Sequence, residues 1–157
     1  MNSTRFLVTF PFLVISAIAG CGGSDPSYAA ADIATTAPSG TIADMDWDSK
    51  SFLIEKSDAD LSVSISDKAS TEECPFLLDE DKAGVLFSVP AQNGEFALSF
   101  GAGHTITLYV PPSQNYIAVD GYVVVSDVTE TTAKIAFVAD AGDGGTVNGT
   151  ISGTICP

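Results

Sequence analysis

Apolar and hydroxyl side chains alternate without a break in Leu61-Ser-Val-Ser-Ile-Ser66. Successive side chains of a β-strand point to opposite faces, so this period of two predicts a strand with one buried apolar face. The alternation returns in Phe96-Ala-Leu-Ser-Phe100 and in Thr105-Ile-Thr-Leu-Tyr-Val110. The pattern therefore predicts an all-β domain.

Turn residues separate the apolar runs at short intervals. Asn93-Gly94 is a strong hairpin signal, because both residues tolerate the backbone angles of a tight turn. Pro111-Pro112 ends the preceding run, since proline cannot donate to a ladder. About nine short strands over residues 40–157 predict a single antiparallel β-sandwich, with an immunoglobulin-like or a jelly-roll-like topology.

The first 20 residues have the composition of a secretory signal. Arg5 is the only arginine of the chain, and the run from Phe6 to Ala19 carries no charge. That run is shorter than the roughly 20 residues that a membrane-spanning helix needs. A charged start, a short apolar core and small residues at its end predict a signal peptide over residues 1–20.

The end of this run, Ile18-Ala-Gly-Cys21, resembles the lipobox of bacterial lipoproteins, in which signal peptidase cuts before a cysteine that carries the lipid. The resemblance implies a lipid on Cys21 and a membrane as the first partner of the chain. In lipoproteins of two-membrane bacteria, an aspartate after that cysteine favours the inner membrane. Gly22 stands there, so the resemblance implies a lipid-anchored location at the outer membrane. The alternative is an ordinary secretory signal cut after Ala17-Ile-Ala19.

The segment from Gly22 to Ser39 has few large apolar side chains. Such a segment buries too little surface to offset the entropy of ordering it. We therefore expect residues 21–39 to be the lipidated cysteine and a disordered, flexible tether, and residues 40–157 to be the folded domain.

The charge balance is strongly acidic. The chain has 20 Asp and Glu residues against 6 Lys and Arg, which gives a formal net charge of −14. Nucleic-acid affinity rests on basic side chains that neutralise phosphates, so a nucleic-acid partner is excluded. The same balance argues against docking of the domain on anionic headgroups.

Two cysteines remain once Cys21 is assigned to the lipid. In an oxidising compartment, an even pair predicts a disulfide between Cys74 and Cys156. Two separate buried thiols are the alternative. The mostly polar residues 67–83 then read as a long loop held by Cys74, with a short helix over 76–83 as the other interpretation.

The last strand carries a second resemblance. Val147-Asn-Gly-Thr-Ile-Ser-Gly-Thr-Ile-Cys156 is similar to the end of small uncharacterised bacterial lipoproteins, which close on a G-T-x-x-G-T strand and a terminal cysteine. Gly40-Thr-Ile and Ser51-Phe52 are similar to their opening strands. The resemblance implies a β domain, a disulfide and a lipid anchor, and it implies no activity.

One acidic run has the spacing of a calcium loop. Asp44, Asp46 and Asp48 alternate, and Glu55 stands at position 12 of the loop they would begin, as in an EF-hand. Ser49 stands where that loop requires glycine, and the flanks read as strands. We therefore expect no metal and no cofactor, and interpret these carboxylates as a solvated stripe.

Two other groups of residues are weaker candidates for ligand binding. Asp140 and Asp143 form a second acidic loop that is also typical of a glycine-rich hairpin turn. Trp47, Tyr109 and Tyr116 offer aromatic faces of the kind that stack on sugars. The alternative for these rings is a place in the core or over strand edges.

Catalytic patterns are weak in this sequence. His104 is the only histidine, and no G-x-S-x-G motif accompanies it. We therefore expect a non-enzymatic, lipid-anchored envelope protein with a structural or binding role, whose protein or glycan partner stays open. The alternatives are a carbohydrate-binding or calcium-dependent adhesion module and an uncharacterised hydrolase.

Overall fold

The computed structural model describes residues 27–75, 81–101 and 103–157. The expected signal peptide, Cys21 and the first residues of the expected tether lie outside the described residues. The same is true of residues 76–80, which belong to the expected loop and to its alternative, a short helix.

The described chain forms eleven strands and two short 3-10 turns, η1 (Ala30–Asp32) and η2 (Gly142–Gly144). The strands are β1 (Ser39–Ile42), β2 (Met45–Asp48), β3 (Ser51–Ser57), β4 (Asp60–Ser66), β5 (Gly84–Pro90), β6 (Gly94–Ala97), β7 (Ile106–Val110), β8 (Gln114–Ala118), β9 (Asp120–Ser126), β10 (Thr132–Asp140) and β11 (Thr146–Cys156).

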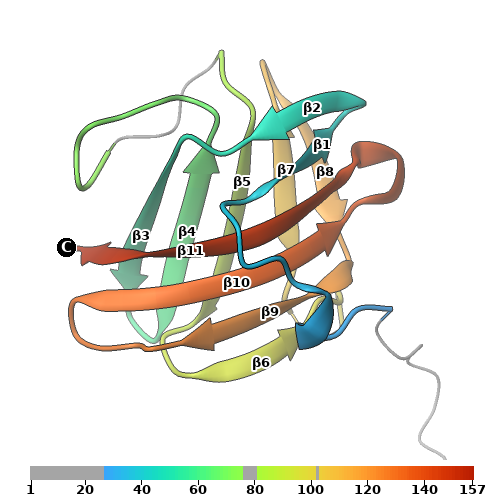
Figure 1. The fold of residues 1–157 in the computed structure, drawn as a ribbon. Coiled ribbons are helices and arrows are strands. Elements are labelled where there is room, and N and C mark those ends of the chain that lie inside the picture. The colour runs from blue at the N-terminus through green and yellow to red at the C-terminus, as the bar shows by residue number, and fades with distance from the viewer. Residues whose placement is uncertain (1–26, 76–80, 102) are drawn as a thin grey trace, which may run out of the picture.

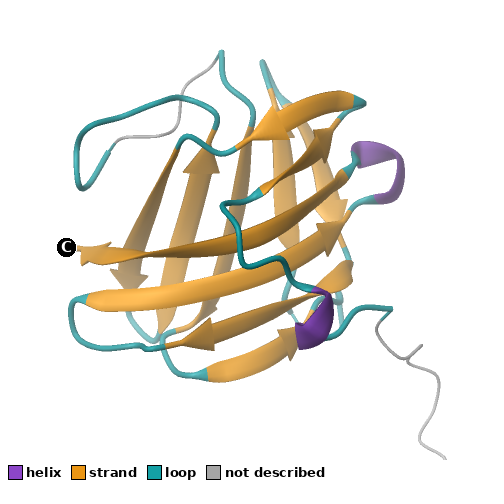
Figure 2. Ribbon diagram, in the orientation of Figure 1, coloured by secondary structure: helices purple, strands orange, loops and turns teal. Residues whose placement is uncertain are grey.

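These strands form one curled sheet, in the order β6-β9-β10-β11-β3-β4-β5-β7-β8, and the β1–β2 hairpin pairs with β11. β6, β9, β10 and β11 run across the front, and β3, β4, β5, β7 and β8 lie behind them (Figure 1). The all-β prediction is confirmed, as the predominance of strands shows (Figure 2).

The expected antiparallel sandwich differs from this arrangement in two respects. The two layers belong to one hydrogen-bonded sheet that continues through β11. Pairing is antiparallel in the other ladders, but β11 pairs with β3 in parallel, with Ile155 opposite Ile54 and Cys156 opposite Glu55. The difference arises because β11 is 11 residues long. Residues 146–154 of β11 pair with β10 in the front layer, where Val147 and Asn148 also pair with β1, and the end of β11 reaches the back layer.

The core lies between the two layers. Leu61, Val63 and Ile65 are at most 1% exposed, as their alternation predicts. The rings of Phe87 on β5 and Phe137 on β10 meet across the core with centroids 5.3 Å apart. Burial of such side chains contributes about 2–3 kcal/mol each, so the contact between layers is the main source of stability.

The strand expected from the alternation in residues 96–100 ends earlier than that alternation does. The alternation places Phe96, Leu98 and Phe100 on one face, but β6 ends at Ala97. Leu98 is buried, whereas Phe100 is 69% exposed. The chain leaves the sheet in a turn after Leu98, so the period of two no longer governs where the ring of Phe100 points.

Residues 27–38, here called the strap, lie against the sheet, although we expected a free tether there. The backbone N–H of Ser27 donates to Asp120 Oδ1 at 3.2 Å. The hydroxyl of Tyr28 donates to Asp140 Oδ2 at 2.9 Å. The strap therefore crosses the starts and ends of strands in the front layer before it enters β1.

Asn148 on β11 holds the middle of the strap. Its Oδ1 accepts the N–H of Ala34 at 2.7 Å, and its Nδ2 donates to the carbonyl of Asp32 at 2.9 Å. Gly149 permits close approach, because a Cβ there would lie 2.3 Å from the Cα of Pro38. The strap is thus held by hydrogen bonds, most of them between its backbone and side chains of the sheet, and it needs no large apolar side chains of its own.

Candidate binding groove between β3 and β11

β3 and β11 diverge from their short parallel pair, and a groove opens between them. On the side away from β10, β11 pairs with β1 at Val147 and Asn148 and with β3 at Ile155 and Cys156. None of the strands in the described part of the chain pairs with residues 149–154 on that side. The sheet is therefore split along this part of β11.

The backbone of Ser152 points into this split. The N–H of Thr150 donates to the carbonyl of Thr36 in the strap at 2.8 Å, on the side away from β10. Backbone groups of a strand alternate between its two edges, so the N–H and C=O of Ser152 point the same way as those of Thr150. The strap ends short of Ser152, which leaves these two groups facing the groove.

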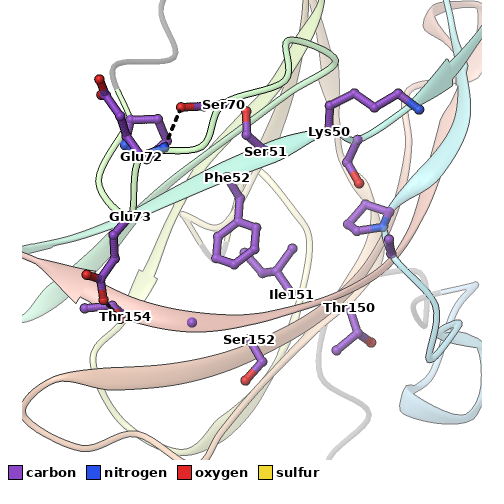
Figure 3. A pocket seen from close by; sticks show the side chains of 15 residues that line it. Lys50, Ser51, Phe52, Ser70, Glu72, Glu73, Thr150, Ile151, Ser152 and Thr154 are labelled. Carbon is purple, nitrogen blue, oxygen red and sulfur yellow. Dashed lines mark hydrogen bonds between the residues drawn. The ribbon is translucent and has the colours of Figure 1, made fainter.

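The groove has a volume of about 470 Å³, and Figure 3 shows its floor and rim. The floor is apolar, with the ring of Phe52 directed toward Ile151 (Figure 3). A Cβ on Gly153 would lie 2.7 Å from that ring, so Phe52 covers Gly153 closely. Hydroxyl groups surround this floor; they belong to Ser49, Ser51, Ser70, Thr150, Ser152 and Thr154.

One wall of the groove is the loop that follows β4. Ser51 Oγ donates to the carbonyl of Lys68, and the N–H of Glu72 donates to Ser70 Oγ at 3.1 Å. Thr154 Oγ1 donates to Glu73 Oε1 at 2.7 Å. These bonds fix the loop beside both strands, so the wall is a defined surface.

A disulfide closes the same wall. Cys74 and Cys156 are bonded, with a Cα–Cα distance of 5.9 Å, within the ordinary range for disulfides. This confirms the predicted pair. The bond attaches the loop to the end of β11, next to the parallel contact with β3.

The two ends of the groove differ in charge. Lys50 lies at one end, and Glu72 and Glu73 lie at the other (Figure 3). The Lys50 side chain is exposed, and no ion pair joins it to the side chains that the structure describes. A ligand that lies along the groove therefore meets a cation at one end and carboxylates at the other.

The acidic candidates do not converge on a metal site. Across residues 27–75, 81–101 and 103–157, no three His, Cys, Asp or Glu side chains lie close enough to hold an ion. Asp44 occupies a turn with φ 63°. Asp46 and Asp48 are exposed on β2, on either side of the buried Trp47.

Asp140 has a structural role in its loop. Its Oδ1 accepts the N–H of Gly142 at 2.8 Å, and its Oδ2 accepts the Tyr28 hydroxyl. The bond to Asp140, followed by burial and by the nearby charges of Asp140, Asp120 and Asp32, raises the pKa of Tyr28 above its ordinary value. Asp143 lies exposed in η2.

The three aromatic candidates for sugar stacking make packing and hydrogen-bond contacts within the domain. Trp47 is only 4% exposed, and its Nε1–H donates to the carbonyl of Ala83 at 3.3 Å. The Tyr109 hydroxyl donates to the Pro112 carbonyl at 3.0 Å. The Tyr116 ring packs so closely on Gly144 that a Cβ there would lie 2.5 Å from its Cγ. These rings cover the core and strand edges.

His104 lies away from the groove. Its ring packs against Phe96, with centroids 5.2 Å apart, and its backbone forms a bridge with Ser99. It is absent from the lining of the groove. The structure therefore places the only histidine in a packing contact.

Sequence reasoning did not identify the groove. The split depends on the parallel contact between residues about 100 positions apart. No local pattern reports that contact. The small side chain of Gly153 beside Ser152 and Thr154 was the one available signal of close packing at this position.

No family model, no curated protein and no solved structure matches this chain. Within the described ranges, no helix has both the length and the apolar character needed to cross a membrane. The lipobox and the second resemblance accordingly remain predictions from the sequence.

Proposed function

We propose that this chain is a lipid-anchored binding protein of the bacterial cell envelope, and that it holds an extended peptide segment in the groove between β3 and β11. The observation that carries the proposal is the unpaired edge of β11 at Ser152. A peptide that adds to a strand edge gains main-chain hydrogen bonds and places alternate side chains in pockets. The role is binding, without catalysis.

The surroundings of Ser152 favour a peptide over other ligands. The floor of Phe52 and Ile151 suits an apolar side chain, and the hydroxyl groups around it suit backbone amides. Lys50 at one end favours an acidic side chain or a C-terminal carboxylate, whereas Glu72 and Glu73 at the other favour a basic side chain. We infer a ligand with a basic residue, an apolar residue and an acidic residue along one extended stretch.

The anchor is the second part of the proposal and rests on Ile18-Ala-Gly-Cys21. The mature chain then begins at Cys21, carries the lipid there, and resides at the outer membrane. Mass spectrometry of protein from the native membrane tests this directly. An acylated Cys21 as the first residue is the expected result. A mature terminus at Gly20 with a free thiol at Cys21 contradicts it.

We also infer that the domain is a variant of a β-sandwich. Its core lies between two layers, as in a sandwich, but the layers share β11. This arrangement supports the binding proposal, because the place where a strand passes from one layer to the other is the place where the sheet splits.

Proline at position 152 tests the role of the strand edge. Ser152→Pro removes the N–H that faces the groove, and no ladder bond to β10 is lost because that N–H points away from β10. Ser152→Ala is the matched control, since it removes only the hydroxyl. The two variants and the parent chain are compared on an array of extended peptides of varied sequence.

We expect the parent chain to select peptides with the charge order described above. Ser152→Ala should bind them within about twofold of the parent, and Ser152→Pro should bind at least about tenfold more weakly, as loss of a buried hydrogen bond predicts. Equal binding by the proline variant rejects strand addition. Selective binding to a glycan array, without peptide binding, favours the carbohydrate-binding alternative.

A further inference from the structure

Phe100 is the most exposed large apolar side chain in the described chain. It is 69% exposed, compared with 53% for Met45, 46% for Ile117 and 39% for Val119. It lies between β6 and β7, and added Cβ atoms on Gly101 and Gly103 would meet nothing within 4 Å. Phe100 therefore projects from the domain, and its ring contributes nothing to the core.

Hydrogen bonds locate this loop beside the start of β9. The N–H of Leu98 donates to the carbonyl of Gly121 at 3.0 Å, two residues before Phe100. Val119, another of the exposed apolar residues, immediately precedes β9. Phe100 and Val119 thus lie at the same corner of the domain.

The strap begins at that corner. Ser27, the first described residue, donates its N–H to Asp120 Oδ1 at 3.2 Å, and Asp120 is the residue after Val119. Figure 1 shows η1 of the strap beside the start of β9 and the end of β6. The described chain therefore begins at the corner where Phe100 and Val119 lie.

We infer that Phe100, with Val119 beside it, contacts the membrane that holds Cys21. This inference rests on the proposed lipid anchor. Five residues lie between Cys21 and Ser27, so the Cα atoms of these two residues are at most about 20 Å apart when the chain is fully extended. The expected tether of residues 21–39 would reach three times as far. Because the strap is bound to the sheet, the corner with Phe100 is held close to the membrane surface.

With a lipid on Cys21, even a weak contact between Phe100 and the membrane is enough to orient the domain. One aromatic ring at the interface binds a membrane only weakly, but the anchor makes the contact intramolecular, with an effective concentration of the order of millimolar. Aromatic side chains also favour the interface between headgroups and acyl chains. The acidic domain receives no attraction from anionic headgroups, so the contact is apolar and is favoured by zwitterionic lipid.

With Phe100 at the membrane, the position of the groove relative to the membrane is also determined. The end of β11, which begins just after Thr154 of the groove, lies on the opposite side of the domain from η1 (Figure 1). With Phe100 toward the membrane, the groove faces away from it. The inferred contact thus presents the groove to ligands in the aqueous phase.

Quenching by brominated lipid tests the contact. The acylated mature lipoprotein is reconstituted in phosphatidylcholine vesicles with or without dibrominated acyl chains, and tryptophan emission is measured. Phe100→Trp places the probe in the loop. Gln92→Trp is the matched control, because Gln92 is exposed in the turn that precedes β6, whereas Phe100 follows that strand. The unchanged protein gives the background from Trp47.

We expect brominated lipid to quench about half of the emission added by Phe100→Trp and almost none of that added by Gln92→Trp. The same domain without its lipid should show no quenching with either variant. Equal quenching of the two variants in protein that floats with the vesicles overturns the contact but leaves the anchor intact. Protein that is purified from the membrane without an acyl group overturns the anchor, and the inferred contact with it.

Discussion

The ring of Phe52 lies directly over Gly153, so closely that a Cβ at position 153 would stand 2.7 Å from the ring. The two residues come from strands that are paired only at one end, β3 and β11. Their contact fills the bottom of the split in the sheet. The depth of the groove therefore depends on the absence of a side chain at position 153.

Gly153→Ala should displace Phe52 and lower the free energy of unfolding. Overpacking of this kind costs about 1–3 kcal/mol, and the displaced ring should also reduce peptide binding in the groove. Chemical denaturation measures the first effect. Gly101→Ala is the control, because nothing lies within 4 Å of its added Cβ, and we expect a change within about 0.5 kcal/mol. Equal stability of the two variants contradicts the packing described here.

Asn148 should determine whether the strap stays on the sheet. Asn148→Ala removes one acceptor and one donor, and each lost hydrogen bond costs about 1 kcal/mol. Asn148→Asp keeps the acceptor for the N–H of Ala34 and loses the donor to Asp32. Hydrogen exchange at the Ala34 amide should therefore accelerate most in the alanine variant and less in the aspartate variant.

Hydrogen exchange in the core strands is the control for both Asn148 variants. Both variants leave the core untouched, so exchange in β4 and β5 should stay as slow as in the parent chain. Faster exchange throughout the domain shows that the variants unfold it. Unchanged exchange at Ala34 in the alanine variant shows that Asn148 does not hold the strap.

The sequence predicts the core of this domain better than it predicts its edges. The alternation in residues 61–66 places Leu61 and Val63 correctly, because burial on one face of a strand selects apolar side chains at every second position. The strap was not predicted, because its small and polar residues are ordered by hydrogen bonds from Asn148 and Thr150. Such backbone contacts leave no trace in the composition of the segment itself.

The groove and the exposure of Phe100 could not be predicted from the sequence, for the same physical reason. The parallel pair of Ile155 with Ile54 is a non-local contact, and a strand pattern does not specify its neighbour. Phe100 continues the period of Leu98, but the chain turns away from the sheet after β6. In both cases the deciding factor is where a strand ends or which strand it meets.

Deprotonation of Tyr28 should weaken the attachment of the strap to the sheet at high pH. Its pKa is raised above the ordinary value of 10.0, chiefly by the hydrogen bond to Asp140. The folded-state pKa then exceeds the unfolded one, so the bond stabilises the strap below pH 10 and this contribution is lost as pH rises through the folded pKa. Phenolate absorbance of the parent chain, compared with that of Tyr28→Phe, should show that Tyr28 titrates above pH 10.0. Asp140→Asn keeps an amide beside the hydroxyl, and should lower the Tyr28 pKa toward 10.0.

The disulfide that closes the wall of the groove should also stabilise the whole domain. Cys74 and Cys156 are 82 positions apart, and a closed loop of that length stabilises by about 4–5 kcal/mol on the chain-entropy model. The double variant Cys74→Ser and Cys156→Ser should therefore lower the free energy of unfolding by up to this amount, measured by chemical denaturation. Far-ultraviolet circular dichroism should stay that of a β protein, because the core lies elsewhere.

The same change should act on the groove more strongly than on the core. Thr154 and Glu73 remain hydrogen-bonded neighbours, but that exposed bond is too weak to hold the end of β11 against fraying. Peptide binding at the Ser152 edge should fall even under conditions where the double variant is fully folded. Full binding by the folded, bridge-free protein contradicts the role of the disulfide as the support of the groove wall, and leaves it only a role in global stability.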